Sequence, residues 1–255
     1  MKSLVFVMKL KTVQASSFKS LFEVLKDVLN DVNIIFDQKG VTILTLDTAR
    51  VSLIDLHLAA ENFEEYECDR QILAGINISN TFKLFKTISN NDTLEISITD
   101  NEMMDIHIKN VDKKTDTKFQ LKLLDINEEQ LVLPIIEPSI VTTMHSIDFQ
   151  RACRDMTNLA SEVMITRKPS KFIISCQGDF ANQETTIYID ETVSKDFTLS
   201  GVYSLKYINI FTKATGMCSN VQIMQEDDNR FLILKYNVAN LGDLNFFLAK
   251  KVDDI

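Results

Sequence analysis

Apolar and polar residues recur along the chain with two different periods. Near 16–29 and 148–160, apolar residues return every three or four positions, which predicts amphipathic helices. Ser16 or Ser17 is the expected N-cap of the first one. Shorter stretches of the same kind at 79–89 and 203–215 predict two more helices. Between them lie runs typical of strands, at 4–11, 33–36, 41–46, 51–58, 94–98, 104–108, 118–124, 140–144, 163–166, 171–176, 185–189, 221–224, 231–236 and 243–248.

The order of these elements occurs twice. Phe18 and Val41 are 23 residues apart, and so are Phe149 and Phe172. Such a repeat indicates a duplicated domain. Each half combines two helices with many strands, which predicts an α+β fold with antiparallel sheets. We expect a first domain at 1–122, a connecting loop at 123–137 and a second domain at 138–255.

The stretch from Leu121 to Ser139 joins the two halves and has an unusual composition. Apolar residues stand next to an acidic run, and Pro134 and Pro138 rule out a long helix. A solvated linker is normally polar. Two interpretations remain open: the segment packs on one of the domains, or it forms a docking surface for a partner, and the first is the more common arrangement.

Composition excludes several classes of protein. The 255 residues include only 6 Gly and 3 Pro, which argues against disorder. The N-terminal apolar run is interrupted at Lys9, and no stretch approaches the roughly 18 apolar residues of a membrane span. We therefore expect a soluble intracellular protein with no membrane partner. The four Cys and three His show no metal-binding spacing, so we expect no metal, no cofactor and no catalytic residues.

Positive charge is concentrated on the predicted helices, although the net charge is -9. The four helices carry eight basic and four acidic residues. The basic residues are three or seven positions apart on each helix and so share a face: Lys19 and Lys26, Lys83 and Lys86, Arg151 and Arg154, Lys206 and Lys213. A solvated outer face explains any one helix, and Glu23 and Asp155 favour that view. The recurrence on all four helices favours contact with the phosphates of a nucleic acid, without reading of its sequence.

Several segments, in order along the whole chain, resemble the eukaryotic DNA sliding clamp family, proliferating cell nuclear antigen. They are Leu46–Leu53, Tyr66–Ile78, Arg151–Met156, Phe211–Thr215 and Phe246–Asp253. The resemblance implies a homotrimeric ring around double-stranded DNA, with helices lining the pore and sheets outside. It implies no catalytic activity. The implied partners are DNA polymerases and other replication or repair proteins with short peptides of the PIP-box type, and an ATP-dependent clamp loader. The implied location is the nucleus, or the replication site of a virus.

The resemblance also assigns roles to residues. The family's pore cations match the eight basic residues named above. Its partner-peptide pocket matches Leu46, Arg50, Leu131, Leu133, Pro134, Phe231, Phe247 and Ala249. Its subunit contact matches an edge strand near Lys118–Leu123, with Phe119 packing near Met156 and Leu159 of a neighbour. Four positions depart from the family pattern: Arg50, Pro169, Phe231 and Lys250. Of these, Arg50 and Phe231 belong to the pocket.

Two other functions are compatible with parts of this pattern. A subunit of a heterotrimeric checkpoint clamp has the same fold and a signalling role. An unrelated acidic enzyme is the other alternative, but the sequence shows no nucleophile with a base, no metal cluster and no phosphate loop.

Overall fold

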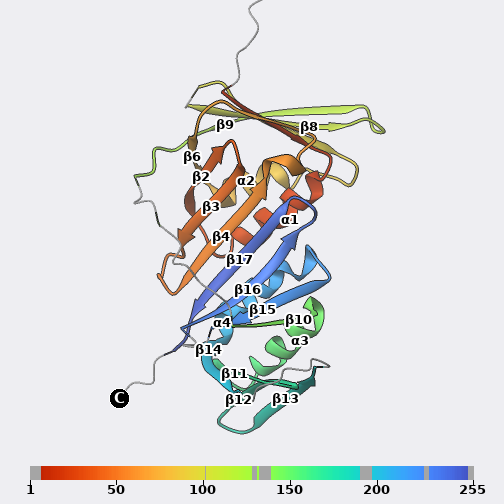
Figure 1. Cartoon of the computed structure of the whole chain (residues 1–255). Coiled ribbons are helices and arrows are strands. Elements are labelled where there is room, and N and C mark those ends of the chain that lie inside the picture. The colour runs from red at the N-terminus through yellow and green to blue at the C-terminus, as the bar shows by residue number, and fades with distance from the viewer. Residues whose placement is uncertain are drawn as a thin grey trace, which may run out of the picture. The chain divides into compact units, whose positions relative to one another are not determined.

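The computed structural model describes residues 7–100, 102–127, 131, 139–189, 197–226 and 230–251 (Figure 1). The chain divides into two compact units. Unit 1 comprises Met1–Thr48, Ile54–Leu131 and Asn237–Leu244, and unit 2 comprises Ala49–Leu53, Val132–Tyr236 and Asn245–Ile255. The domains expected from the sequence are continuous stretches, whereas each of these units also includes a short segment from the other half of the chain.

Unit 1 contains two antiparallel sheets and two helices. The first sheet has the strand order β5-β1-β7-β8-β9 and the second contains β4-β3-β2-β6. The strands are β1 (Met8–Thr12), β2 (Asp31–Asp37), β3 (Gly40–Leu46), β4 (Ser52–Ala59), β5 (Glu65–Cys68), β6 (Ile72–Asn77), β7 (Thr93–Ile98), β8 (Met103–Asn110) and β9 (Thr115–Lys122). The helices are α1 (Ala15–Leu25) and α2 (Ile78–Phe85), and a 3-10 turn spans Ala60–Asn62.

The core of unit 1 forms where the two helices meet both sheets. The Phe85 ring of α2 packs edge-on against Phe18 and Phe22 of α1, with ring centroids 6.2 and 4.7 Å apart. Ile43 and Ile96, one from each sheet, line the same core and are fully buried or nearly so. Because apolar side chains fill one face of each helix, the opposite face is left for polar residues.

Unit 2 repeats this plan. Its first sheet has the order β13-β12-β11-β14, and its second contains β10-β15-β16-β17. The strands are β10 (Ile140–His145), β11 (Glu162–Lys168), β12 (Lys171–Gln177), β13 (Asn182–Tyr188), β14 (Leu199–Ser204), β15 (Asn220–Gln225), β16 (Phe231–Val238) and β17 (Gly242–Ala249). The helices are α3 (Ser146–Met156) and α4 (Leu205–Phe211), and α4 continues as a 3-10 turn over Thr212–Gly216. Phe149 and Phe211, from α3 and α4, are fully buried.

The α+β class and the four helices are confirmed, but several element boundaries differ. Helix α1 begins at Ala15, and its N-cap is Gln14 without a side-chain bond, so the expected Ser16 or Ser17 cap is wrong. Helix α4 begins at Leu205 instead of 203, because Tyr203 and Ser204 pair with Val163 and Glu162 in the sheet. Strands β5, β6 and β14 are not indicated by the sequence pattern.

Candidate DNA, partner and subunit surfaces

In unit 1 the four helix lysines differ in how they are held. The Lys19 Nζ donates a hydrogen bond to the Ile88 carbonyl at 3.1 Å, and the Lys26 Nζ lies 3.2 Å from Asp27 and 5.3 Å from the centre of the Phe82 ring. Both lysines are half-buried. These contacts hold the α1 cations against the protein, which lowers their availability for an external anion.

The two cations of α2 are more accessible. Lys83 and Lys86 are exposed, and the Lys83 Nζ donates to the Asn80 side chain at 3.0 Å. Ile78, Thr81 and Phe85 are the buried residues of this helix. The cations therefore lie on the face of α2 that points away from the core.

The basic residues of unit 2 are more accessible than those of unit 1. All four of its helix cations are exposed: Arg151, Arg154, Lys206 and Lys213. Hydrogen bonds tie the two helices together, from the Gln150 amide to the Thr212 carbonyl at 2.8 Å and from the Asn209 amide to the Thr157 hydroxyl at 2.6 Å. Each unit thus presents cations on a pair of helices that pack against each other, an arrangement suited to phosphate contacts.

The residues of the implied peptide pocket are distributed over both units. In unit 1, Leu46 is half-buried at the end of β3 and Leu131 is 37% exposed. Leu133 and Pro134 lie outside the described residues. In unit 2, the Lys250 N–H donates to the Arg230 carbonyl at 2.8 Å. Because Arg230 precedes Phe231 and Lys250 follows Ala249, the half-buried Phe231 and Ala249 lie at the same end of the neighbouring strands β16 and β17.

Two further pocket candidates in unit 2 differ in exposure. The Ala249 N–H donates to the Val51 carbonyl at 3.3 Å. Because Arg50 precedes Val51, this bond places the exposed Arg50 near the same end of β17 as Ala249. Arg50 has a positive φ of 57°, a backbone conformation that is uncommon for a residue with a side chain. Phe247 is only 7% exposed, so little of its ring is available for a ligand in this conformation.

Phe119 lies on β9, the last strand of its sheet. Its cross-strand partner is Ile106, which is 1% exposed, so both side chains are on the core-facing side. Phe119 itself is half-buried. An edge strand with a partly uncovered aromatic residue is a suitable surface for a second chain.

In unit 2, β13 is the last strand of its sheet. Leu159 is half-buried, and its carbonyl approaches Gly178 next to the β12–β13 turn. Met156 is fully buried within its own unit and belongs to the core there. Phe180, in the same turn, is 79% exposed. The sequence pattern assigned Phe180 no role, because this residue lies between the strands expected at 171–176 and 185–189.

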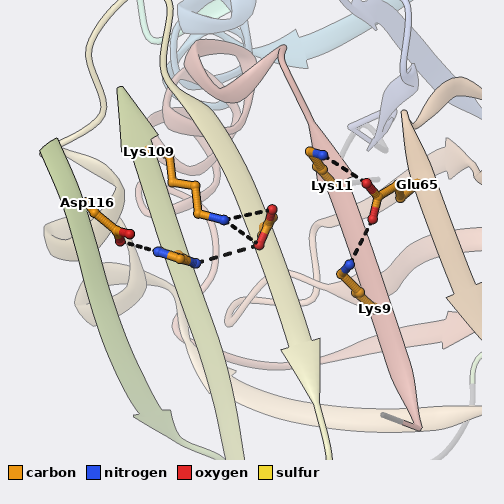
Figure 2. Close-up of polar contacts among 7 residues, drawn as sticks. Lys9, Lys11, Glu65, Lys109 and Asp116 are labelled. Carbon is orange, nitrogen blue, oxygen red and sulfur yellow. Dashed lines mark hydrogen bonds and ion pairs between the residues drawn. The ribbon is translucent and has the colours of Figure 1, made fainter. Parts of the chain in front are cut away.

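Ionic contacts cross the sheet that ends in β9 (Figure 2). Glu65 of β5 accepts hydrogen bonds from Lys9 and Lys11 of β1, each at 2.8 Å. His107 of β8 is hydrogen-bonded to Asp116 of β9. The other ring nitrogen of His107 lies 3.6 Å from Glu95 of β7, which also accepts from Lys109 at 3.1 Å. The His107–Asp116 bond links β9 to β8, and such cross-strand pairs favour one register for the edge strand.

The same contacts shift pKa values. Hydrogen bonds from Lys11 and Lys9 lower the pKa of Glu65 from 4.5 to about 2. The bond to Glu65 in turn raises the pKa of both lysines. The pKa of Asp116 is lowered, chiefly by its hydrogen bond with His107.

Replacing Glu65 by glutamine is expected to reduce stability in a pH-dependent way. Because the folded-state pKa of Glu65 lies below the unfolded value, ionised Glu65 stabilises the fold above pH 4.5, and this contribution is lost as the pH falls through about 2. Urea unfolding of wild type and Glu65→Gln should therefore differ at pH 7 and converge toward pH 3. The control Glu61→Gln, at an exposed position, should match wild type at both values; an E65Q difference that is the same at both would contradict the assignment.

Within the described ranges, no three His, Cys, Asp or Glu side chains are placed to hold a metal ion. No helix in those ranges has the length and hydropathy required to cross a membrane.

Comparison with known proteins identifies the family. Residues 7–130 match the N-terminal domain model of proliferating cell nuclear antigen, and residues 133–251 match its C-terminal domain model. The chain is 36% identical over 250 residues to a probable DNA polymerase sliding clamp of Paramecium bursaria Chlorella virus 1, with 94% of this chain and 95% of the relative covered. The chain therefore belongs to the proliferating cell nuclear antigen family of DNA polymerase sliding clamps.

Proposed function

We propose that three copies of the chain form a closed ring around duplex DNA and slide along it without reading its sequence. Members of the family are non-catalytic, so the role is to keep polymerases and other replication or repair enzymes on their template. The observation that carries the proposal is the segregation of charge. Both units present cations on the exposed faces of their helices, although the chain as a whole carries -9.

A ring explains how weak contacts are sufficient for DNA retention. Exposed lysines and arginines contact phosphates, which are the same at every base pair, and such contacts are sensitive to salt. Tight or base-specific contacts would stop sliding. A closed ring instead holds DNA by topology, and the DNA can move freely through it.

The subunit contact is proposed to join β9 of one copy to β13 of the next. Both are edge strands, and each has a large apolar residue nearby: half-buried Phe119 on β9 and exposed Phe180 beside β13. Pairing between copies covers both edges in every subunit, and closed rotational symmetry then limits the assembly. A homotrimer of the pure chain would exclude the heterotrimeric checkpoint clamp.

Partners are proposed to dock through short peptides with apolar and aromatic anchors at Leu131, Leu133 and the other pocket candidates. An ATP-dependent loader opens the ring, and the protein works where DNA is replicated, in the nucleus or at the replication site of a virus. The support for peptide docking is the family membership together with the partly exposed Leu46, Leu131 and Phe231.

Removing Leu131 and Leu133 together is expected to weaken peptide binding at least tenfold. An anchor of two aromatic rings and one aliphatic side chain removes about 300–400 Å² from water, worth about 8–10 kcal/mol before ordering costs, and the two leucines provide part of that contact. Calorimetry with a peptide of the form Gln-x-x-Leu/Ile-x-x-Phe-Phe measures the change.

The matched control truncates two other exposed apolar side chains, Val13 and Ile147, which are 59% and 50% exposed. That variant should bind as wild type does, and both variants should remain folded trimers. Equal peptide affinity of wild type and the Leu131/Leu133 double variant would mean that the segment is only packed against its own domain.

A further inference from the structure

The segment that follows β9 is fastened to the second sheet of unit 1 by two hydrogen bonds. The Leu124 N–H donates to the Gly75 carbonyl of β6 at 2.7 Å. Two residues later, the Ile126 carbonyl accepts a hydrogen bond from the Asn33 side-chain amide of β2 at 3.0 Å. Residues 93 positions apart in the chain are thereby joined. We call Asn33 and Gly75 the clasp.

Gly75 is required at its position because of this approach. A Cβ there would lie 2.2 Å from the Leu124 carbonyl oxygen and 3.1 Å from Cδ1 of Ile126. Contacts below 3.0 Å to a backbone atom force a displacement, and Gly75 does not have a positive φ. The missing side chain therefore provides space for the segment and does not serve an unusual backbone conformation.

The clasp lies on the same face of the sheet as a pocket candidate. Asn33 and Gly75 are direct register partners across β2 and β6. Two residues further along β2, and therefore on the same face as Asn33, Ile35 is paired with Thr42 of β3. Alternation along β3 places Leu46 on the same face as Thr42. Thr42 and Leu46 are both half-buried, in contrast to Val41 and Ile43 on the other face.

We propose that Asn33 and Gly75 are positioning residues for partner-peptide binding, because they fix the start of the segment that carries Leu131. This inference rests on the peptide docking proposed above. Leu131 lies five residues beyond Ile126, so anchoring Ile126 confines Leu131 to within about 18 Å of Ile126. Without the clasp, that segment explores more conformations, and a peptide that binds it must meet a larger ordering cost.

Asn33→Asp removes the donor with almost no change in shape. An ionised carboxylate only accepts hydrogen bonds, so at pH 7 it faces the Ile126 carbonyl without a proton to share. Asn33→Leu removes the donor without adding charge, and Asn33→Gln keeps the amide. We expect Asn33→Asp and Asn33→Leu to weaken binding of the Gln-x-x-Leu/Ile-x-x-Phe-Phe peptide about fivefold. This is the change in affinity that corresponds to the typical free energy of one hydrogen bond. Asn33→Gln should recover part of that loss.

Gly75→Ala tests the other half of the clasp independently. The added methyl group must displace the Leu124 carbonyl, so hydrogen exchange of the Leu124 amide should become faster and peptide affinity should fall about fivefold or more. Thr42→Val, a substitution of similar size on the same sheet face, is the matched control and should leave affinity and exchange unchanged. Thermal unfolding and trimer mass, measured for every variant, separate a positioning role from loss of the fold.

The outcomes distinguish this inference from the function on which it rests. If the wild-type chain does not bind the peptide, peptide docking fails and the inference fails with it. If wild type binds the peptide and the Leu131/Leu133 double variant does not, the docking site stands. If the folded Asn33→Asp, Asn33→Leu and Gly75→Ala proteins then all bind the peptide as wild type does, the positioning role is overturned.

Discussion

Replacing Phe119 by alanine is expected to shift the assembly from trimer toward monomer. The Phe119 side chain is half-buried in its own subunit and lies on the edge strand β9. In the proposed trimer, a neighbouring subunit completes the burial of this side chain. Truncating a buried aromatic side chain costs about 3–5 kcal/mol, and each 1.4 kcal/mol is about a tenfold change in a dissociation constant. The change applies to all three contacts, because the assembly is symmetric.

Light scattering coupled to size-exclusion chromatography over a range of concentrations measures this shift. Wild type should have about three times the chain mass of 29.1 kDa, and the variant should have a lower mass at micromolar concentration. Lys118→Ala changes the adjacent residue, whose side chain lies on the opposite face of β9, and should remain trimeric. A Phe119→Ala protein that is as trimeric as wild type would place the subunit contact elsewhere.

Reversing the charge of Lys83 and Lys213 together is expected to lower polymerase processivity about tenfold or more while the trimer stays intact. Each subunit exchanges two cations for two anions on helix faces that meet the phosphates in the proposed ring, and every lost phosphate contact reduces the salt-dependent part of the affinity. Both lysines are exposed, one in each unit: Lys83 lies on α2, and Lys213 lies in the 3-10 turn that continues α4.

The matched control for this change is Lys39→Glu with Lys168→Glu. These residues are also exposed, one in each unit, but they lie in the β2–β3 turn and at the end of β11. Net charge changes by the same amount in both double variants, so a general effect of charge would affect them equally. Unchanged processivity in the helix variant, or an equal loss in the control, would show that the helix lysines form an ordinary solvated face.

Periodicity predicted the helices and the duplication because those features depend on local spacing. Phe18 and Phe22 are four residues apart on α1, Phe85 belongs to the apolar stripe of α2, and all three are buried. Strand β6 was not predicted, because Ala74 and Gly75 have low strand propensity; pairing with β2 determines that strand, and such pairing joins distant parts of the chain.

The prediction of the candidate sites from the sequence was limited in the same way, because contacts between distant parts of the chain cannot be identified from local spacing. The basic residues are identifiable from spacing, but the sequence does not show that Ile88 and Phe82 engage Lys19 and Lys26, because those partners lie outside α1. Met156 fits an apolar helix stripe whether it faces the core or a neighbour. Only the packed structure shows that it is fully buried.

Threading on linear duplex DNA tests the sliding-ring function most directly and requires no loader. Biotin on both DNA ends allows streptavidin to block them either before or after the protein is added, and a high-salt wash then removes contacts that depend on phosphate charge. A ring enters only over a free end, so protein should survive the wash when the ends are blocked after addition and should be absent when they are blocked beforehand. Equal retention in both orders, or no retention in either, would contradict the account.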